Sequence, residues 1–134
     1  MIVPQLDLGS EYQQLRVEID AAVQRVLASG GFIGGAENDA LERELADYIG
    51  VAEAVCVNSG TDALLLSLKA LGIGAGDEVI VPGFTFFATA EAVCLTGAQP
   101  RFADCSARHY NIDVDRVRHA LTPRTKAVIA VHLF

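Results

Sequence analysis

The feature that most constrains the fold is an alternation of short apolar runs with helical patterns across the second half of the chain. The runs expected to be strands are 53–57, 77–82, 99–104 and 126–134, and the segments expected to be helices between them are 61–72, 85–97 and 113–121. Strands that alternate with helices form βαβ units, which build a parallel sheet covered by helices on both faces. The sequence therefore predicts an α/β fold.

The first 50 residues have a different period. Residues 11–28 place apolar side chains at steps of three and four, as one face of an amphipathic helix does, and Ser10 is the expected N-cap. A second helix is expected over 38–49, and its inward face is formed by Leu41, Leu45, Tyr48 and Ile49. These two helices make an N-terminal helical arm ahead of the α/β region.

Composition limits the possible partners. The 134 residues are 51% hydrophobic and carry a net charge of −7. A negative total disfavours nucleic acid, whose binding depends on neutralising phosphates. No apolar run approaches the roughly 18 residues that cross a bilayer, and the N-terminus lacks the pattern of a secretory signal. We therefore expect a cytoplasmic protein with no membrane partner.

The residues that often bind metals show no metal-binding pattern. Cys56, Cys94 and Cys105 are odd in number and have no metal-ligand spacing, so we expect buried free thiols in a reducing compartment. The three histidines share no such spacing either, although His132 lies on the last expected strand and could face a site. No metal site is predicted.

The first candidate site is the segment Ser59-Gly60-Thr61-Asp62, which joins an expected strand to an expected helix. The N–H groups at a helix N-terminus converge on one point and attract anions. Gly60 allows close approach of a ligand, the hydroxyls of Ser59 and Thr61 can donate to phosphate oxygens, and Asp62 contributes its main-chain N–H. Taken alone, the same residues are better explained as a simple helix cap.

The second candidate is "VPGFTFFATAEA", which follows the expected strand 77–82 at the end where ligands of α/β sheets bind. Thr85 is the expected cap of the following helix. Phe86 could stack on a flat heterocycle, whereas Phe84 and Phe87 are better explained as core residues.

A glycine-rich loop, "SGGFIGG", follows the first helix and holds Phe32, Ile33 and Gly34 near its centre. Two apolar residues on an exposed loop favour contact with a partner subunit or a substrate. A plain connector between two helices explains the loop equally well.

Together these segments resemble the sugar aminotransferases of the DegT/DnrJ/EryC1/StrS family. The resemblance runs in order through nearly the whole chain, in "VLASGGFIGG", "LERELADYIGV", "VNSGTDALLLSLKALGIGAGDEVIVPGFTFFATAEAV", "GAQPRFAD", "YNID" and "TPRTKAVIAVHLF". It implies the fold type I (aspartate-aminotransferase-like) architecture, with this chain as the N-terminal part of the large domain. It also implies pyridoxal 5'-phosphate (PLP) as cofactor.

The resemblance further implies roles for particular residues. It places Gly60, Thr61 and Asp62 at the PLP phosphate and Phe86 against the pyridine ring. It places the loop around Phe32 to Gly34 near the active site of a homodimer. The implied reaction moves an amino group from an amino acid, glutamate in this family, onto a nucleotide-linked keto-sugar used for cell-surface polysaccharides or antibiotics.

The sequence lacks two residues of the family pattern. The acidic residue that pairs with the pyridine nitrogen and the lysine that forms the Schiff base have no counterpart in these 134 residues, since neither Lys69 nor Lys126 matches that lysine. We therefore expect a helical arm plus an incomplete PLP-binding domain over 1–134, a fragment that is inactive alone.

Two alternatives stay open. A sugar dehydratase of the same fold, in which histidine replaces the lysine, would carry the same N-terminal segments. A small non-catalytic α/β nucleotide-binding module would have no PLP and would need a complete sheet within 134 residues.

Overall fold

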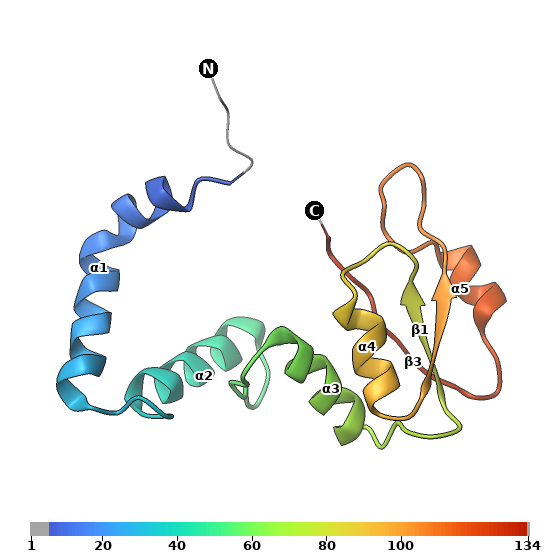
Figure 1. Ribbon diagram of the computed structural model, residues 1–134, viewed down its shortest axis with the longest axis horizontal. Helices are drawn as coiled ribbons and strands as arrows, with labels where there is room; N and C mark the ends of the chain where they lie inside the picture. Colours follow the sequence, from blue (N-terminus) through green and yellow to red (C-terminus); the bar gives the residue numbers. More distant parts are fainter. Residues whose placement is uncertain (1–5, 134) are drawn as a thin grey trace. The chain divides into compact units, whose positions relative to one another are not determined.

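A computed structural model describes residues 6–133. The chain divides into two compact units, Met1–Cys56 and Val57–Phe134. The first unit holds two helices and the second holds a small sheet with its helices (Figure 1).

The first unit contains α1 (Leu8–Ser29) and α2 (Ala36–Ile49), as the periodicity predicts. The expectation that Ser10 is the N-cap of the first helix is wrong. Asp7 takes that place, because its Oδ1 accepts a hydrogen bond from the Ser10 N–H at 3.0 Å. The helix ends at Gly30, whose φ of +68° is a left-handed conformation that glycine adopts without strain.

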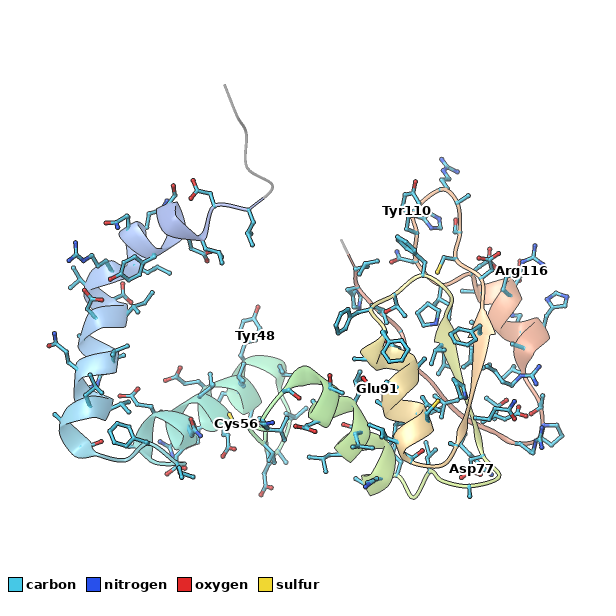
Figure 2. All side chains as sticks on the ribbon, viewed as in Figure 1. Tyr48, Cys56, Asp77, Glu91, Tyr110 and Arg116 are labelled. Atoms are coloured by element: carbon cyan, nitrogen blue, oxygen red, sulfur yellow. The ribbon has the colours of Figure 1, made fainter. Side chains whose placement is uncertain are left out.

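The expectation that α2 buries an apolar face is also wrong for this unit. Ala46 is the buried residue of the described part of α2, whereas Tyr48 is 89% exposed and projects away from the helix in Figure 2. The other three residues of that expected face, Leu41, Leu45 and Ile49, are exposed as well. Periodicity fixes which side chains share a face, but burial requires a second surface to cover that face.

The second unit is built on a parallel sheet of three strands, β1 (Glu78–Pro82), β2 (Gln99–Ala103) and β3 (Thr125–Val128). The strand order is β2-β1-β3, and β1 pairs in parallel with both neighbours. All five residues of β1 are buried, as expected for a central strand covered on both faces.

Three helices accompany this sheet: α3 (Gly60–Ala70), α4 (Ala88–Leu95) and α5 (Val114–Ala120). The connection from β1 to β2 and the connection from β2 to β3 run in opposite directions across the sheet. Because both crossovers are right-handed by rule, they place α4 and α5 on opposite faces. The predicted α/β fold, a parallel sheet with helices on both faces, is confirmed.

The apolar core lies on the face covered by α3 and α4. Val79 and Val81 of β1 pack with Leu68 of α3 and with Ala92 and Val93 of α4. Alternation along β1 turns Glu78 and Ile80 toward the opposite face. This packing fixes α3 and α4 against the central strand, and so fixes the loops at their ends.

Two expected strands differ from the structure. Residues 53–57 form no strand, because an extended segment becomes one only when its main chain pairs with a neighbour. The strand expected over 126–134 ends at Val128, although the Ile129 N–H still donates to the Ile80 carbonyl at 2.9 Å. Phe134 lies outside the described residues.

The three cysteines are free, as expected, but the expectation that they are buried is wrong. Cys94 is exposed, and Cys56 and Cys105 are half-buried. Cys94 follows the buried Val93 on α4, and one step of about 100° around the helix carries its side chain away from the sheet.

Among residues 6–133, none of the helices has the length and apolar character needed to cross a membrane.

Candidate functional site

A cleft of about 560 Å³ opens at the carboxyl end of the sheet in the second unit. It is bounded by the start of α3, the loop after β1 with the first turn of α4, and the segment after β3. Its lining residues are Gly60, Thr61, Leu64, Thr85, Phe86, Ala88, Thr89, Ile129, Ala130, Val131 and His132. Three of the four residues predicted to bind the cofactor, Gly60, Thr61 and Phe86, thus line one cavity.

The sheet topology explains where this cleft lies. In doubly wound sheets with the strand order 2-1-3, the crevice for ligands forms between the carboxyl ends of the first and third strands. Here the residues after β1 contribute Thr85 and Phe86, and the residues after β3 contribute Ile129 to His132. α3 begins at the same end, so its N-terminus faces the crevice.

The turn that enters α3 is held by its own side chains. Ser59 is the N-cap, and its Oγ accepts a hydrogen bond from the Asp62 N–H at 3.1 Å. The Asp62 Oδ2 accepts from Ser59 Oγ at 3.2 Å and from Asn58 Nδ2 at 3.1 Å. The Asp62 N–H is therefore already engaged, and the Asp62 side chain stabilises the turn instead of lining the cleft.

The two main-chain N–H groups before Asp62 stay available. Within residues 6–133, the N–H groups of Gly60 and Thr61 donate to no protein acceptor. A Cβ added at Gly60 would meet no atom within 4 Å, so a ligand can approach the main chain there. No acidic side chain lines the cleft in the described chain, and the positive end of the α3 dipole points into it. The arrangement favours an anion.

The loop after β1 supplies further lining residues, Thr85 and Phe86. α4 begins at Ala88, three residues later than expected, so Thr85 is not its cap. The Thr85 hydroxyl instead lies 3.0 Å from the hydroxyl of Thr89, which is 4% exposed. Phe86 lines the cleft and is 74% exposed as a residue, which leaves it accessible to a ligand.

The neighbouring phenylalanines do not belong to the core. Phe84 is 51% exposed and Phe87 is 72% exposed, so the expectation that they are buried is wrong. The core contacts on this side come from Val81 and from α4, and the loop between them lies outside that packing. Phe86 differs from Phe87 in lining the cleft, although both are equally accessible.

Some lining residues were not singled out from the sequence. Thr89 lies four positions after Thr85, a spacing that places two side chains on one helical face. Ile129 to Val131 follow a strand that was expected to continue through them. The strand ends at Val128, and ligands of α/β sheets bind beyond the carboxyl ends of strands. A correct prediction of this strand end would therefore have identified Ile129 to Val131 as candidate site residues.

The glycine-rich loop lies in the first unit. A separate cavity of about 470 Å³ there is lined by Phe32 and Gly34 together with residues of α1 and α2. Ile33 is fully exposed. Arg25 and Glu37 form an ion pair of 2.9 Å beside this cavity.

Comparison with known proteins gives a consistent family. The family model of the DegT/DnrJ/EryC1/StrS aminotransferases matches residues 13–134. Over 132 residues the chain is 50% identical to a UDP-N-acetyl-3-dehydro-α-D-glucosamine 3-aminotransferase of Acidithiobacillus ferrooxidans, covering 98% of this chain and 36% of that protein. It is 49% identical to a dTDP-3-amino-3,4,6-trideoxy-α-D-glucose transaminase of Streptomyces venezuelae, with 98% and 35% covered.

Solved structures agree. The crystal structure of S. venezuelae DesV matches with a TM-score of 0.92 and 50% identity, covering 98% of this chain and 35% of that one. An aminotransferase of the same family from Brucella abortus matches with a TM-score of 0.89 and 38% identity, covering 96% and 36%. The chain thus spans about a third of the length of these relatives.

Proposed function

Because the chain belongs to the DegT/DnrJ/EryC1/StrS aminotransferase family, we propose that it forms the part of a PLP-dependent sugar aminotransferase that holds the cofactor's phosphate and one face of its ring. The observation that carries this proposal is the single cleft that unites Gly60 and Thr61 with Phe86. The whole protein's activity is part of the proposal, since this chain spans about a third of its relatives.

The residues of the cleft fit a phosphate group. Gly60 and Thr61 offer two free main-chain N–H groups, and the Thr61 hydroxyl can add a third donor. Donors at a helix N-terminus hold a phosphate without a lysine or an arginine. Asp62 contributes indirectly, because its hydrogen bonds to Ser59 and Asn58 keep the turn in shape.

The same cleft fits an aromatic ring beside that phosphate. Phe86 lines the cleft together with the α3 N-terminus and is exposed, and aromatic faces stack on flat heterocycles. Leu64 and Ile129 add apolar side chains to the lining, which suits the apolar faces of a ring. When bound, PLP supplies an electron sink for chemistry at the amino-bearing carbon of a substrate.

Neither lysine of the chain is suited to attack the cofactor's aldehyde. Lys69 lies in the last turn of α3, about 13 Å along the helix from Gly60 at a rise of 1.5 Å per residue. Lys126 is exposed on β3, ahead of the carboxyl end where the cleft opens. We propose that the amine comes from a part of the whole protein outside residues 1–134, and that this chain alone is inactive.

The proposed substrates follow the names of the relatives. Those names describe transaminases of UDP- and dTDP-linked sugars, and we propose a nucleotide-linked keto-sugar as acceptor and glutamate as amino donor. We also propose a cytoplasmic homodimer in which the loop of Phe32, Ile33 and Gly34 contacts the partner subunit or the substrate. The full exposure of Ile33, an apolar side chain, supports such a contact.

Borohydride trapping tests the proposal. The whole protein, incubated with PLP and reduced, should carry the cofactor on a lysine outside residues 1–134, as located by peptide mass spectrometry. Added glutamate before reduction should lower the trapped fraction, because amino transfer releases the cofactor from that lysine.

The 134-residue chain is the matched control and should trap no cofactor. Trapping on Lys69 or Lys126 would overturn the assignment of the amine to another part of the protein. Failure of the whole protein to bind PLP at all would overturn the proposed function itself.

A further inference from the structure

A second loop at the carboxyl end of the sheet contains a backbone conformation that side chains rarely adopt. Tyr110 lies in the loop between β2 and α5 (Figure 2) and has φ of +58°. Among residues 6–133 it is the one non-glycine residue with positive φ. This left-handed region is unfavourable for a bulky side chain, so surrounding contacts must hold it there.

Main-chain hydrogen bonds close this loop. The Tyr110 N–H donates to the Ser106 carbonyl at 2.8 Å, and the Ser106 N–H donates to the Asn111 carbonyl at 2.9 Å. An antiparallel bridge between Cys105 and Ile112 joins the two ends of the loop. The loop is thus a closed unit that presents Tyr110 at a fixed place.

The Tyr110 ring contacts the loop that forms one wall of the cleft. Its centroid lies 6.1 Å from that of Phe84, and the two rings are tilted by 48°. These values lie within the range of favourable aromatic pairs. Phe84 is two positions before Phe86, so the contact reaches the segment that carries the proposed stacking ring.

The segment 83–87 depends on such contacts for its position. At one end the Gly83 N–H donates to the Ala103 carbonyl at 2.8 Å, and further along the Thr85 hydroxyl lies 3.0 Å from that of Thr89. Phe86 is 74% exposed as a residue, so its own packing fixes the ring weakly. Its position is therefore set mainly by the main chain, and Phe84 is a point where that main chain is held.

We propose that Tyr110 is a positioning residue: its ring holds Phe84 and the segment 83–87, and thereby places the Phe86 ring over the cleft. This inference rests on the proposed function, in which Phe86 stacks on PLP. It assigns to the loop after β2 a role in ring binding that is separate from phosphate binding at Gly60 and Thr61.

Three variants of the whole protein test the role of the ring. Tyr110→Asn removes the ring while keeping a residue that tolerates positive φ, and Tyr110→Phe keeps the ring without the hydroxyl. His109→Asn is the matched control on the neighbouring exposed residue. Each variant is titrated with PLP and separately with inorganic phosphate, and the visible circular dichroism of bound PLP is recorded as a measure of its orientation.

We expect Tyr110→Asn to raise the Kd for PLP by about 3- to 10-fold, the range that the loss of one aromatic pair produces. Its circular dichroism band should weaken, while its Kd for inorganic phosphate stays unchanged. Tyr110→Phe and His109→Asn should match the parent in all three measurements. An unchanged Kd for PLP and an unchanged band in Tyr110→Asn would overturn the inference.

A further variant, at the other ring of the pair, covers the case in which Tyr110→Asn does not fold. Phe84→Leu removes the other ring of the pair and should reproduce the same split between PLP and phosphate. Equal weakening of both ligands would mean a general structural defect and would also overturn the inference. If the parent itself fails to bind PLP, the proposed function fails and the role of Tyr110 fails with it.

Discussion

The Thr122 hydroxyl donates a hydrogen bond of 2.6 Å to Oε2 of Glu78, a carboxylate that is 1% exposed at the start of the central strand. Arg124 donates to the other oxygen of Glu78, and Arg101 lies 3.5 Å from Oε2. These contacts hold the segment that leads into β3 against β1, at the end of the sheet opposite the cleft. Arg101 belongs to β2, so residues of β1, of β2 and of the segment before β3 meet at this carboxylate.

The first prediction concerns pH. The hydrogen bond from Thr122, followed by the contacts with Arg124 and Arg101, holds the pKa of Glu78 below its ordinary value despite burial. A carboxyl group whose pKa is lower in the folded protein stabilises the fold above its unfolded pKa. That stabilisation is lost as the pH falls through the folded pKa. We expect Glu78→Gln to lower the midpoint of thermal unfolding at pH 7, with the deficit shrinking below about pH 4.5.

Asp115→Asn is the control for this measurement. Asp115 pairs with Arg118 at 2.9 Å, but both side chains are exposed, and exposed pairs contribute little. Its unfolding midpoint should stay near that of the parent at every pH. A deficit in Glu78→Gln that persists unchanged down to pH 3 would contradict the predicted role of the charge.

The second prediction concerns the phosphate. Thr61→Val keeps the shape of the side chain and removes the hydroxyl at the cleft. Loss of one hydrogen bond to a charged group corresponds to roughly a tenfold or larger increase in Kd. Isothermal titration with PLP and with inorganic phosphate should show this increase for both ligands. Ser67→Ala removes an exposed hydroxyl from the same helix and should change neither Kd.

The third prediction separates ring binding from phosphate binding. Phe86→Leu should raise the Kd for PLP by about 3- to 10-fold, because an aromatic stacking contact is lost. Its Kd for inorganic phosphate should not change. Phe87→Leu is matched in chemistry and exposure but lies outside the cleft, so it should bind both ligands like the parent. Equal weakening by the two variants would remove Phe86 from its proposed place.

The fourth prediction tests the packing that supports the cleft. Leu68 is 4% exposed between α3 and the sheet, and Leu68→Ala should lower the free energy of unfolding by about 2–5 kcal/mol. Leu71 lies three positions later and is 72% exposed, so Leu71→Ala should have a much smaller effect. Chemical denaturation of the whole protein provides the measurement. Similar losses from both variants would mean that Leu68 is not a core residue.

The predictions from the sequence agree best with the structure where residues close together in the chain are enough to define a helix or a strand. The boundaries of α3 follow from a serine cap and an apolar run. The start of α5 follows from Asp113, whose Oδ1 accepts from the N–H groups of Asp115 and Arg116. The central strand β1 was predictable because an unbroken apolar run is typical of a strand buried on both faces. The proposed phosphate-binding residues were predicted from the same local pattern, although the pattern alone also fitted a simple cap.

The predictions fail where strand pairing or burial depends on another segment that must cover or pair with the residues. Residues 53–57 have strand-like composition but pair with no strand in the described chain, and the apolar face of α2 around Tyr48 is exposed in its unit. Phe84 and Phe87 are apolar yet exposed, because the packing of the core was completed by Val81 and α4. Hydrophobicity indicates that a residue favours burial, but it does not specify the surface that provides it.

The sequence by itself determined the α/β class, the parallel strands 78–82 and 99–103, the capped start of α3 and the family, because each depends on residues close together or in a fixed order. Only the tertiary structure shows that His132 joins Gly60 and Phe86 in one cleft, and that Tyr110 contacts Phe84. These residues are far apart in the chain. They meet because the strand order β2-β1-β3 brings the carboxyl ends of its parallel strands to one edge of the sheet.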